Sequence, residues 1–288
     1  MLTPHLTLNC NGQLLSLEEP IVMGILNVTP DSFYDGGRYQ DNSAILRQAE
    51  KMLAEGAKII DIGGMSSRPG AAIIDVAEEL QRVVAPIKVI HQTFPDAIIS
   101  IDTVRAEVAQ AAVAVGASII NDISAGKIDP DFYQTVADLG VPYVLMHMQG
   151  KPATMQEQPK YADISLEVLD FFIKEVGKLR ALGLKDIILD PGFGFGKTID
   201  HNYQLLNHIH AFQILDLPIL AGISRKSMIH KFLGITPETA LNGTTALNMV
   251  ALQQGAKILR VHDVKEAVET IQLYLQLERT QSAVYSVQ

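Results

Sequence analysis

The amino-acid sequence predicts an α/β fold, a (β/α)8 TIM barrel with an N-terminal β-hairpin. Eight short apolar runs alternate with amphipathic stretches, and the long polar loops follow the runs. Five of the junctions where a helix leads into the next run carry a glycine. Alternating strands and helices indicate a parallel sheet, and eight strands close a barrel of this kind.

The eight expected strands are short segments rich in Ile, Leu and Val. They are 21–28, 58–64, 97–102, 118–124, 142–148, 186–191, 218–223 and 256–262. An open, doubly wound sheet is the alternative. However, no Gly-x-Gly-x-x-Gly pattern opens a helix after the first strand, as a dinucleotide-binding fold would show.

The first segment has a different pattern. Two short apolar–polar runs flank Asn11-Gly12, which suits a type I′ turn because both central residues need a positive φ. We therefore expect a hairpin over 6–17. A hairpin alone is only marginally stable in water, so it should cover one end of the barrel. The predicted domains are an N-terminal β-hairpin extension over 1–18 and the (β/α)8 barrel over 19–288.

The expected helices carry apolar residues at three- and four-residue steps, as in 43–53, and a further helix is expected over 106–115. Glycine tolerates the left-handed conformation that ends a helix, so glycines predict the helix ends. The junction glycines are Gly56, Gly116, Gly140, Gly183 and Gly255.

Composition excludes several classes of function. The net charge of −9 argues against a general nucleic-acid or anionic-membrane surface, which needs excess Lys and Arg. The single cysteine, Cys10, cannot form an internal disulfide and fits a reducing compartment. The sequence shows neither a signal-peptide pattern nor an apolar run of the roughly 18 residues that span a bilayer. We expect a soluble, cytoplasmic protein without nucleic-acid or membrane partners.

Polar residues end the expected strands, and the carboxyl ends of parallel barrel strands converge on one face. Asp102, Asn121 and Asp190 offer two carboxylates and an amide, which together suit a flat heterocycle with an amidine-like or guanidine-like edge. Taken singly, each Asp is more commonly a helix cap.

Cations follow the last two strands. Arg260 and His262 alternate, so they share one strand face and form a candidate anion clamp; the alternative is a solvated strand end with a salt bridge to Asp263. Ser224-Arg225-Lys226-Ser227 adds cations beside them, and a Schiff-base role is an alternative for Lys226.

Other strand-end residues favour structural roles. The loop before Lys197 fails the phosphate-loop pattern, because Pro191 stands where that pattern needs Gly. His147 alone favours a structural role, and Asp61 and Asp122 receive no assignment. No dedicated metal motif occurs, so any metal would be a hard cation bound by Asn27 and substrate oxygens, as magnesium prefers.

Together the motifs resemble those of the dihydropteroate synthase family. They match in order over roughly residues 20–265, and the ordered set is far more specific than any one motif. The motifs are Gly24-Ile-Leu-Asn27-Val-Thr-Pro-Asp31-Ser-Phe33, Ser67-Arg68-Pro69-Gly70, Ile101-Asp102, Asn121-Asp122-Ile123, Met146-His147-Met148-Gln149-Gly150, Asp190-Pro-Gly-Phe-Gly-Phe195, Ser224-Arg225-Lys226-Ser227 and Arg260-Val-His262.

The resemblance implies a pterin-binding TIM barrel, a transferase of folate biosynthesis. Such enzymes join 6-hydroxymethyl-7,8-dihydropterin diphosphate to 4-aminobenzoate and release 7,8-dihydropteroate and diphosphate. The implied partners are these two small-molecule substrates and a second copy of the chain in a homodimer. The implied cofactor is Mg²⁺, and sulfonamide drugs would compete for the aminobenzoate pocket.

The resemblance also implies residue roles. The pterin-binding residues are Asp102, Asn121, Met148, Asp190 and Lys226. Diphosphate binds to Asn27, Ser67, Arg260 and His262, with the metal at Asn27. Aminobenzoate binds to Phe33, Ser67, Arg68, Pro69, Phe195, Lys226 and Ser227. The catalytic set is Asn27, Asp102, Lys226, Arg260 and His262. Ser67 departs from the family pattern, which usually has Thr there.

Three other functions remain as alternatives. A pterin-dependent methyltransferase shares the barrel, but it needs neither the Ser-Arg-Pro-Gly motif nor an anion clamp. A pterin-binding relative without turnover is disfavoured because Asn27, Arg68, Lys226 and Arg260 are retained. The third is an aldolase that forms a Schiff base at Lys226.

Overall fold

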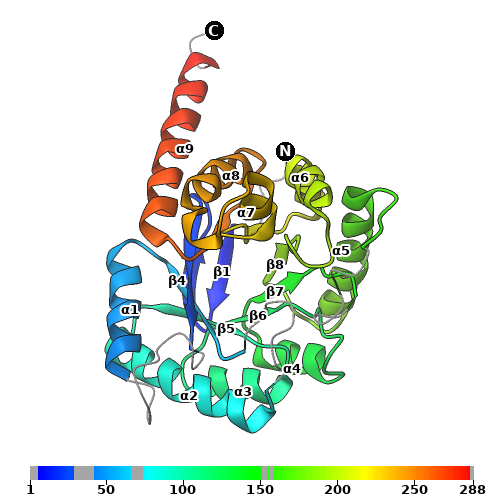
Figure 1. Ribbon diagram of the computed structural model, residues 1–288. Helices are drawn as coiled ribbons and strands as arrows, with labels where there is room; N and C mark the ends of the chain where they lie inside the picture. Colours follow the sequence, from blue (N-terminus) through cyan, green and yellow to red (C-terminus); the bar gives the residue numbers. More distant parts are fainter. Residues whose placement is uncertain (1–5, 29–41, 66–73, 151–154, 156–158, 286–288) are drawn as a thin grey trace.

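The computed structural model describes residues 6–28, 42–65, 74–150, 155 and 159–285. Within them, eight parallel strands form a barrel surrounded by helices, with a separate antiparallel hairpin (Figure 1). The predicted (β/α)8 barrel with an N-terminal hairpin is therefore confirmed. The division into domains at residue 18 stays a prediction.

The strands pair in the order β8-β7-β6-β5-β4-β3-β10-β9. An isolated bridge between Leu189 and Ile219 links the two ends of this order and closes the barrel. The strands are β3 (Ile21–Asn27), β4 (Ile59–Gly63), β5 (Ile98–Asp102), β6 (Ile119–Asp122), β7 (Tyr143–Met146), β8 (Ile187–Asp190), β9 (Leu220–Ala221) and β10 (Ile258–Val261).

The helices lie between the strands in sequence and cover the outside of the barrel (Figure 1). They are α1 (Asn42–Ala54), α2 (Val76–Thr93), α3 (Ala106–Ala114), α4 (Phe132–Leu139), α5 (Ile164–Ala181), α6 (Ile199–His208), η2 (Ile209–Leu215), α7 (Ser227–Leu233), η3 (Pro237–Thr239), α8 (Leu241–Gln253) and α9 (Val264–Tyr285). Within the described residues, no helix is long and apolar enough to cross a membrane.

Glycine ends the helices as the sequence predicts. All five junction glycines have a positive φ, for example 103° at Gly56 and 123° at Gly116. At Gly116 a side chain is also excluded by space, because an added Cβ would lie 2.4 Å from the His91 ring. The short turns that follow lead each chain segment directly into its next strand.

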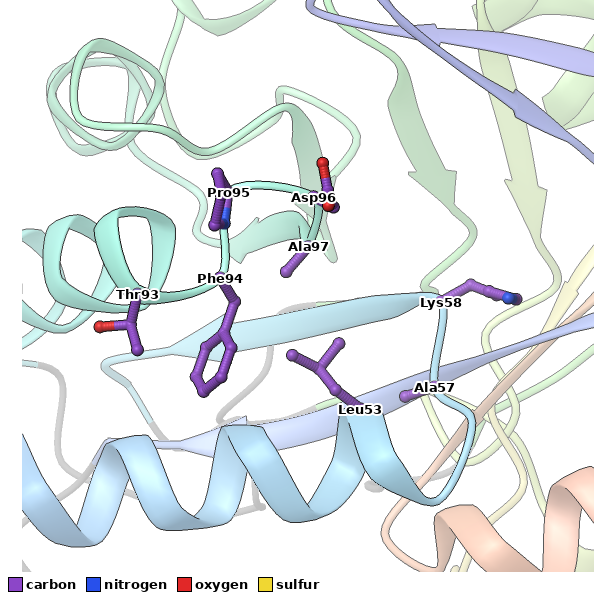
Figure 2. Close-up of a pocket in the computed structure, with 8 residues that line it drawn as sticks. All are labelled: Leu53, Ala57, Lys58, Thr93, Phe94, Pro95, Asp96 and Ala97. Carbon is purple, nitrogen blue, oxygen red and sulfur yellow. The ribbon is translucent and has the colours of Figure 1, made fainter.

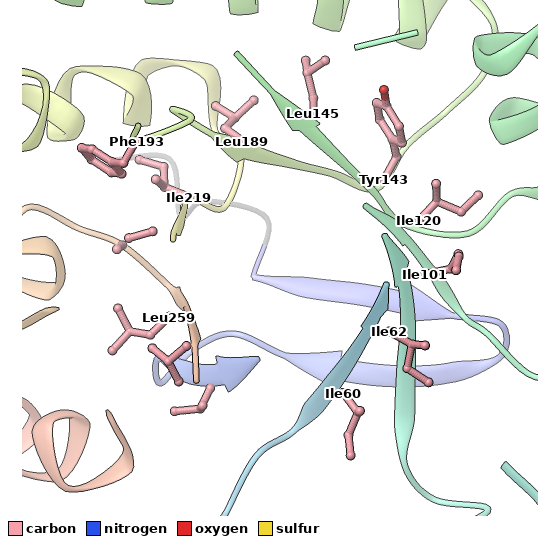
Figure 3. Packing of buried hydrophobic residues seen from close by; sticks show 14 of the residues in the cluster. Ile60, Ile62, Ile101, Ile120, Tyr143, Leu145, Leu189, Phe193, Ile219 and Leu259 are labelled. Atoms are coloured by element: carbon pink, nitrogen blue, oxygen red, sulfur yellow. The ribbon is translucent and has the colours of Figure 1, made fainter. Parts of the chain in front are cut away.

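Alternate residues of each strand face outward, where they pack beneath the helices. Figure 3 shows this outer layer, in which Ile60 and Ile62 of β4 lie beside Ile101 of β5 and Ile120 of β6. The inward residues at the amino ends of the strands are also aliphatic. They form a separate cluster that includes Ile59, Ile98, Ile119, Val144, Ile188, Leu220 and Ile258.

The hairpin closes the amino end of the barrel. Its strands β1 (Thr7–Cys10) and β2 (Gln13–Ser16) pair in register across a turn with φ of 53° at Asn11 and 93° at Gly12. Inward residues Leu8, Cys10, Leu15 and Leu17 join the aliphatic cluster of the strands. The amide of Asn9 also donates to Asp186 Oδ2 at 3.0 Å. The hairpin thus seals the end of the barrel opposite the loops that follow the strands.

Candidate active site

The barrel interior changes from apolar to polar along its axis. Two residues beyond the aliphatic cluster, the inward positions hold Asp61, Ser100, Asn121, Asp190 and Arg260, on five different strands. All but Arg260 are buried by their surface exposure, and Arg260 is half-buried. Buried polar groups cost stability unless they are paired, so their partners decide what this end of the barrel can do.

Arg260 lies between two carboxylates. Its Nε donates to Asp61 Oδ2 at 2.7 Å, and its Nη2 lies 2.6 Å from the same oxygen. Nη2 also donates to Asp102 Oδ2 at 2.8 Å. The Asn121 amide donates from Nδ2 to Asp61 Oδ2 at 3.1 Å. These contacts join four strands into one hydrogen-bonded group.

A pocket opens above this group at the carboxyl ends of the strands. Its lining residues are Asp102, Asn121, Ile123, Met146, Asp190, Phe195, Gly222, Lys226 and Arg260. Two of the inward positions at this end of the barrel are glycines, and the missing side chains leave space there. An added Cβ at Gly222 would lie 3.7 Å from Lys226 Nζ, and one at Gly63 would lie 3.5 Å from Asp102 Cβ.

Burial shifts the titration of the charged pocket residues. It raises the pKa of Asp102 to about 7, while the Arg260 guanidinium acts in the opposite direction. It also raises the pKa of Asp190, and the neighbouring Lys226 ammonium opposes this shift. Burial lowers the pKa of Lys226 to about 8, against the attraction of Asp190. The lowered Lys226 pKa could not be seen in the sequence.

Lys226 also contacts the loop after β8. Its ammonium donates to the carbonyl of Phe193 and lies 4.9 Å from the centre of the Phe195 ring. Phe195 and Lys226 therefore form one wall of the pocket, with a cation held over an aromatic face.

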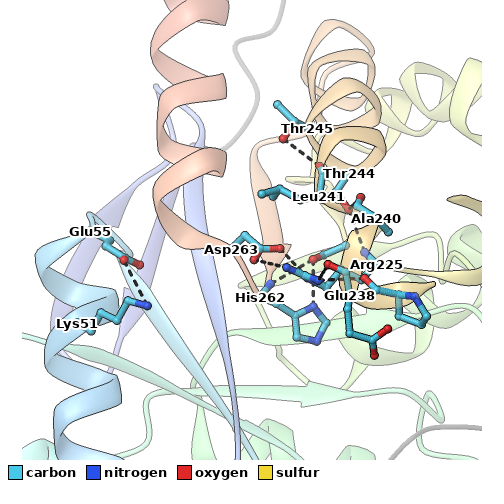
Figure 4. A network of polar contacts seen from close by, with 12 residues as sticks. Lys51, Glu55, Arg225, Glu238, Ala240, Leu241, Thr244, Thr245, His262 and Asp263 are labelled. Carbon is cyan, nitrogen blue, oxygen red and sulfur yellow. Dashed lines mark hydrogen bonds and ion pairs between the residues drawn. The ribbon is translucent and has the colours of Figure 1, made fainter. Parts of the chain in front are cut away.

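Arg225, the residue before Lys226, faces away from the pocket and stabilises the fold through hydrogen bonds. It makes two hydrogen bonds to Asp263, of 2.7 and 2.9 Å, as Figure 4 shows. It also donates to the carbonyls of Pro237 and Glu238 at 2.9 and 2.6 Å. The alternative of a salt bridge from the Arg260 strand to Asp263 is wrong, because Asp263 pairs with Arg225 and Arg260 pairs with Asp61 and Asp102.

Lys197 and His147 have the structural roles that the sequence favours. The buried Lys197 ammonium lies 3.0 Å from His147 Nδ1 and donates to the carbonyls of Gly192 and Phe195 at 2.9 and 3.1 Å. These bonds fix the loop that carries Phe195. Asp122 is structural as well, because it accepts from the amides of Ser124 and Gly126 and from the Tyr143 hydroxyl.

The pocket brings together six of the predicted site residues: Asp102, Asn121, Asp190, Phe195, Lys226 and Arg260. Asn27 ends β3 opposite Gly63, and His262 is exposed at the rim, with its Nδ1 3.0 Å from Ser224 Oγ. Ser227 begins α7. Phe33, Ser67, Arg68 and Pro69 lie outside the described residues.

Sequence reasoning missed some pocket residues. Ile123, Met146 and Gly222 line the pocket, whereas Met148 packs in a cluster with Met146 and Ile123. Strand alternation contains a signal for Met146, because it pairs in register with Asp190 and so faces the same way. The sequence also gives no role to Asp61, which contacts the site residues Asn121 and Arg260 in the structure.

Among the described residues, no group of three or more His, Cys, Asp or Glu side chains is arranged to hold a metal ion. Another hollow lies at the amino end of the barrel, beside the turns that precede β4 and β5. It is lined by Leu53, Ala57, Lys58, Thr93, Phe94, Pro95, Asp96 and Ala97 (Figure 2). None of the predicted site residues lies there, so the pocket at the carboxyl end is the candidate active site.

The sequence matches the family model described as pterin binding enzyme over residues 23–262. The chain belongs to this family of pterin-binding enzymes. Within the family it is 47% identical, over 274 residues, to the dihydropteroate synthase of Escherichia coli strain K12. That match covers 94% of this chain and 95% of the relative.

Solved structures of the family agree with the barrel. The chain is similar to a Yersinia pestis dihydropteroate synthase in complex with a sulfonamide drug, with a TM-score of 0.89 and 44% identity, over 96% of this chain and 99% of that one. It is also similar to a Xanthomonas albilineans dihydropteroate synthase in complex with 7,8-dihydropteroate, with a TM-score of 0.85 and 39% identity, over 94% and 98% of the two chains. The predicted function, dihydropteroate synthase, a transferase of folate synthesis, is confirmed.

Proposed function

We propose that the dihydropterin ring binds in the pocket at the carboxyl end of the barrel, against Asp102, Asn121 and Asp190. The observation that carries this proposal is the chemistry of the pocket floor. Two carboxylates accept hydrogen bonds there, and Asn121 presents its carbonyl oxygen because its NH₂ group is bonded to Asp61. A pterin edge offers the N–H donors that such a floor accepts. Met148 would pack near the ring with Met146 and Ile123.

The diphosphate group of the substrate would lie at the rim, near Asn27, Arg260 and His262. The Arg260 Nη1 makes no hydrogen bond within the described part of the chain, so its two N–H groups can point to phosphate oxygens. Charge-assisted bonds of this kind stabilise the negative charge that develops on a leaving diphosphate. Lys226 would lie between the two groups, since the charges of both Asp190 and Arg260 act on its ammonium.

The reaction needs no protein nucleophile. The bond between the pterin methylene carbon and the diphosphate oxygen breaks, and its electron pair leaves with the diphosphate. The carboxylates on the pocket floor would stabilise the positive charge left on the pterin. The amine nitrogen of 4-aminobenzoate then forms the new C–N bond and loses one proton. The pocket contributes orientation and electrostatic stabilisation.

The aminobenzoate would bind beside Phe195, Lys226 and Ser227. The Phe195 ring offers an apolar face, and Ser227 offers a hydroxyl that can donate to a carboxylate. Phe33, Ser67, Arg68 and Pro69 are proposed for the same substrate, and Ser67 for the diphosphate as well, on the family resemblance alone.

Magnesium is the proposed cofactor, with Asn27 as its protein ligand. The amide oxygen of Asn27 is a hard ligand, which suits an ion that prefers oxygen, keeps several waters and also binds substrate phosphates. Gly63, which has no side chain, adjoins the Asn27 amide. A Cβ added at Gly63 would lie 3.8 Å from Asn27 Oδ1. When bound, the ion would neutralise charge on the leaving diphosphate.

We also propose a cytoplasmic homodimer formed through the outer helices. Large apolar side chains are exposed on η2 and α7, with Ile214 75% and Phe232 65% exposed. Exposed apolar groups of this size often mark subunit interfaces. The cytoplasmic location rests on the unpaired, buried Cys10.

One coupled assay tests the proposed site. Purified protein should release diphosphate only when the pterin diphosphate, 4-aminobenzoate and Mg²⁺ are all present. Arg260→Ala should raise the KM for the pterin diphosphate by more than it weakens the affinity for a pterin without diphosphate, because Arg260 also pairs with Asp102. An Arg260→Ala enzyme with an unaltered KM for the pterin diphosphate would refute the proposed clamp.

A further inference from the structure

Asp61 lies beneath the pocket and does not line it. The residue is 1% exposed, on the inward face of β4, and its side chain is fully buried. The pocket floor above it consists of Asp102, Asn121 and Asp190 with the cation Arg260. Asp61 therefore has no access to substrate and can influence the reaction only through its neighbours.

One oxygen of Asp61 holds two pocket residues at once. Oδ2 accepts from Arg260 Nε at 2.7 Å and from Asn121 Nδ2 at 3.1 Å, and Arg260 Nη2 lies 2.6 Å from it. The contacts reach from β4 to β6 on one side and to β10 on the other. A single atom thereby sets the relative positions of a pterin-binding amide and a guanidinium.

The carboxylate also decides which way each partner faces. An ionised carboxylate only accepts hydrogen bonds, so it fixes the Asn121 NH₂ group downward and turns the carbonyl oxygen to the pocket. It takes the Nε edge of Arg260, which leaves Nη1 directed away from the Asp61 contact. Without Asp61, Asn121 could rotate and Arg260 would keep only Asp102 among these carboxylate partners.

The other Asp61 oxygen shows that this arrangement is not a simple device for stability. Oδ1 is buried and has no hydrogen-bond partner within the described residues. A buried acceptor without a partner destabilises the fold. A role in folding does not explain a carboxylate that carries this cost. The orientation of Asn121 and Arg260 above it does.

We propose that Asp61 is a positioning residue of the synthase reaction, which orients Arg260 toward the diphosphate and the Asn121 carbonyl oxygen toward the pterin ring. This inference rests on the proposed roles of those two residues. Its effect should therefore fall on the pterin diphosphate and spare 4-aminobenzoate, which none of the Asp61 partners is proposed to bind.

Asp61→Asn is the direct test, because it keeps the shape and removes the charge. We expect the KM for the pterin diphosphate to rise about 10- to 100-fold and kcat to fall, as when other orienting partners are lost. The KM for 4-aminobenzoate should change by less than about 3-fold. Steady-state kinetics with each substrate varied in turn measure both values.

Ser100→Ala is the matched control. Ser100 pairs in register with Asp61, is equally buried, and its hydroxyl has no partner within the described residues. This variant should keep all kinetic constants within about 3-fold of the parent enzyme. Equal losses in the two variants, or an Asp61→Asn enzyme that loses affinity for both substrates alike, would assign Asp61 a purely structural role.

A double-mutant cycle covers the case in which Asp61→Asn folds poorly. Asp61→Asn combined with Arg260→Met removes both charges together, so neither is left buried alone. If Asp61 acts partly through Arg260, adding Asp61→Asn to Arg260→Met should weaken binding of the pterin diphosphate less than Asp61→Asn does in the parent enzyme, because only the effect through Asn121 remains. Calorimetry that finds the same loss with and without Arg260 overturns the inference.

The proposed roles of Arg260 and Asp61 can be refuted separately. An unaltered pterin diphosphate KM in Arg260→Ala refutes the clamp itself. A clear effect in Arg260→Ala with none in Asp61→Asn refutes only the positioning role.

Discussion

The two ends of the barrel interior are built from the same eight strands but hold opposite kinds of side chain. At the amino end, inward aliphatic residues and the hairpin form a closed apolar cluster. At the carboxyl end, two residues further along the strands, Asn121, Asp190 and Arg260 line a pocket, and Asp61 lies beneath it, bonded to Asn121 and Arg260. Apolar burial stabilises the fold, whereas buried charges reduce stability unless they are well paired. Residues near the start of each strand thus stabilise the fold, whereas residues near its end form the candidate active site.

The largest effect on stability should come from the amino end. Leu17 of the hairpin segment is fully buried, so Leu17→Ala should lower the free energy of unfolding by about 2–5 kcal/mol. Urea unfolding measures this loss, while the KM values of the folded enzyme should be unchanged. Leu14→Ser is the control from the same hairpin. Leu14 is 71% exposed, so this substitution should change the free energy of unfolding by less than about 0.5 kcal/mol. Similar losses for both variants would contradict the role of the hairpin as a seal.

A smaller loss is expected from the structural cation at the carboxyl end. Arg225→Ala removes the paired bonds to Asp263 and should cost about 1–3 kcal/mol. Arg225 has a φ of 56°, a conformation that glycine adopts freely. Arg225→Gly should therefore lose less stability than Arg225→Ala. Thermal unfolding of both variants tests this order. A greater loss in the glycine variant would show that backbone strain at this position is unimportant.

The effects of pH on stability and on pterin affinity should be smaller than the effects of these substitutions. The two effects should have opposite signs. Burial raises the pKa of Asp102 to about 7, from an ordinary value near 3.8. The folded state therefore holds this proton more tightly, so its contribution to stability is present at low pH and is lost as pH rises through about 7. In the proposed site pterin binding uses the ionised carboxylate, so pterin affinity should increase over the same rise in pH. Asp102→Asn should remove most of both trends, and calorimetry and unfolding at several pH values measure them.

The sequence predicted the barrel well because its signals are local. Helix ends were marked by glycines such as Gly56 and Gly255, and the hairpin turn by Asn11-Gly12. The strand ends Asp102, Asn121, Asp190, Lys226 and Arg260 were identified, and the fold brings them to one pocket. Observed strands are shorter than expected in places, and β9 has only two residues, Leu220–Ala221, where 218–223 were expected.

The pairings within the site could not be predicted, because they depend on contacts between distant residues. Asp61 and Arg260 are 199 positions apart, and nothing local connects them. Arg225 and Lys226 are adjacent cations in the sequence, yet one binds Asp263 and the other faces the pocket. The backbone at Arg225 is left-handed, with a φ of 56°, and an arginine gives no sequence signal for this conformation.

Asp102→Ala tests the division between the two ends most directly, because stability and pterin affinity can be measured on the same variant. Asp102 lines the pocket and Arg260 keeps its bond to Asp61, so the free energy of unfolding should stay within about 1 kcal/mol of the parent. Calorimetry should show at least about 100-fold weaker binding of the pterin substrate. An Asp102→Ala protein that binds pterin with unchanged affinity, or that loses stability as Leu17→Ala does, would contradict the account.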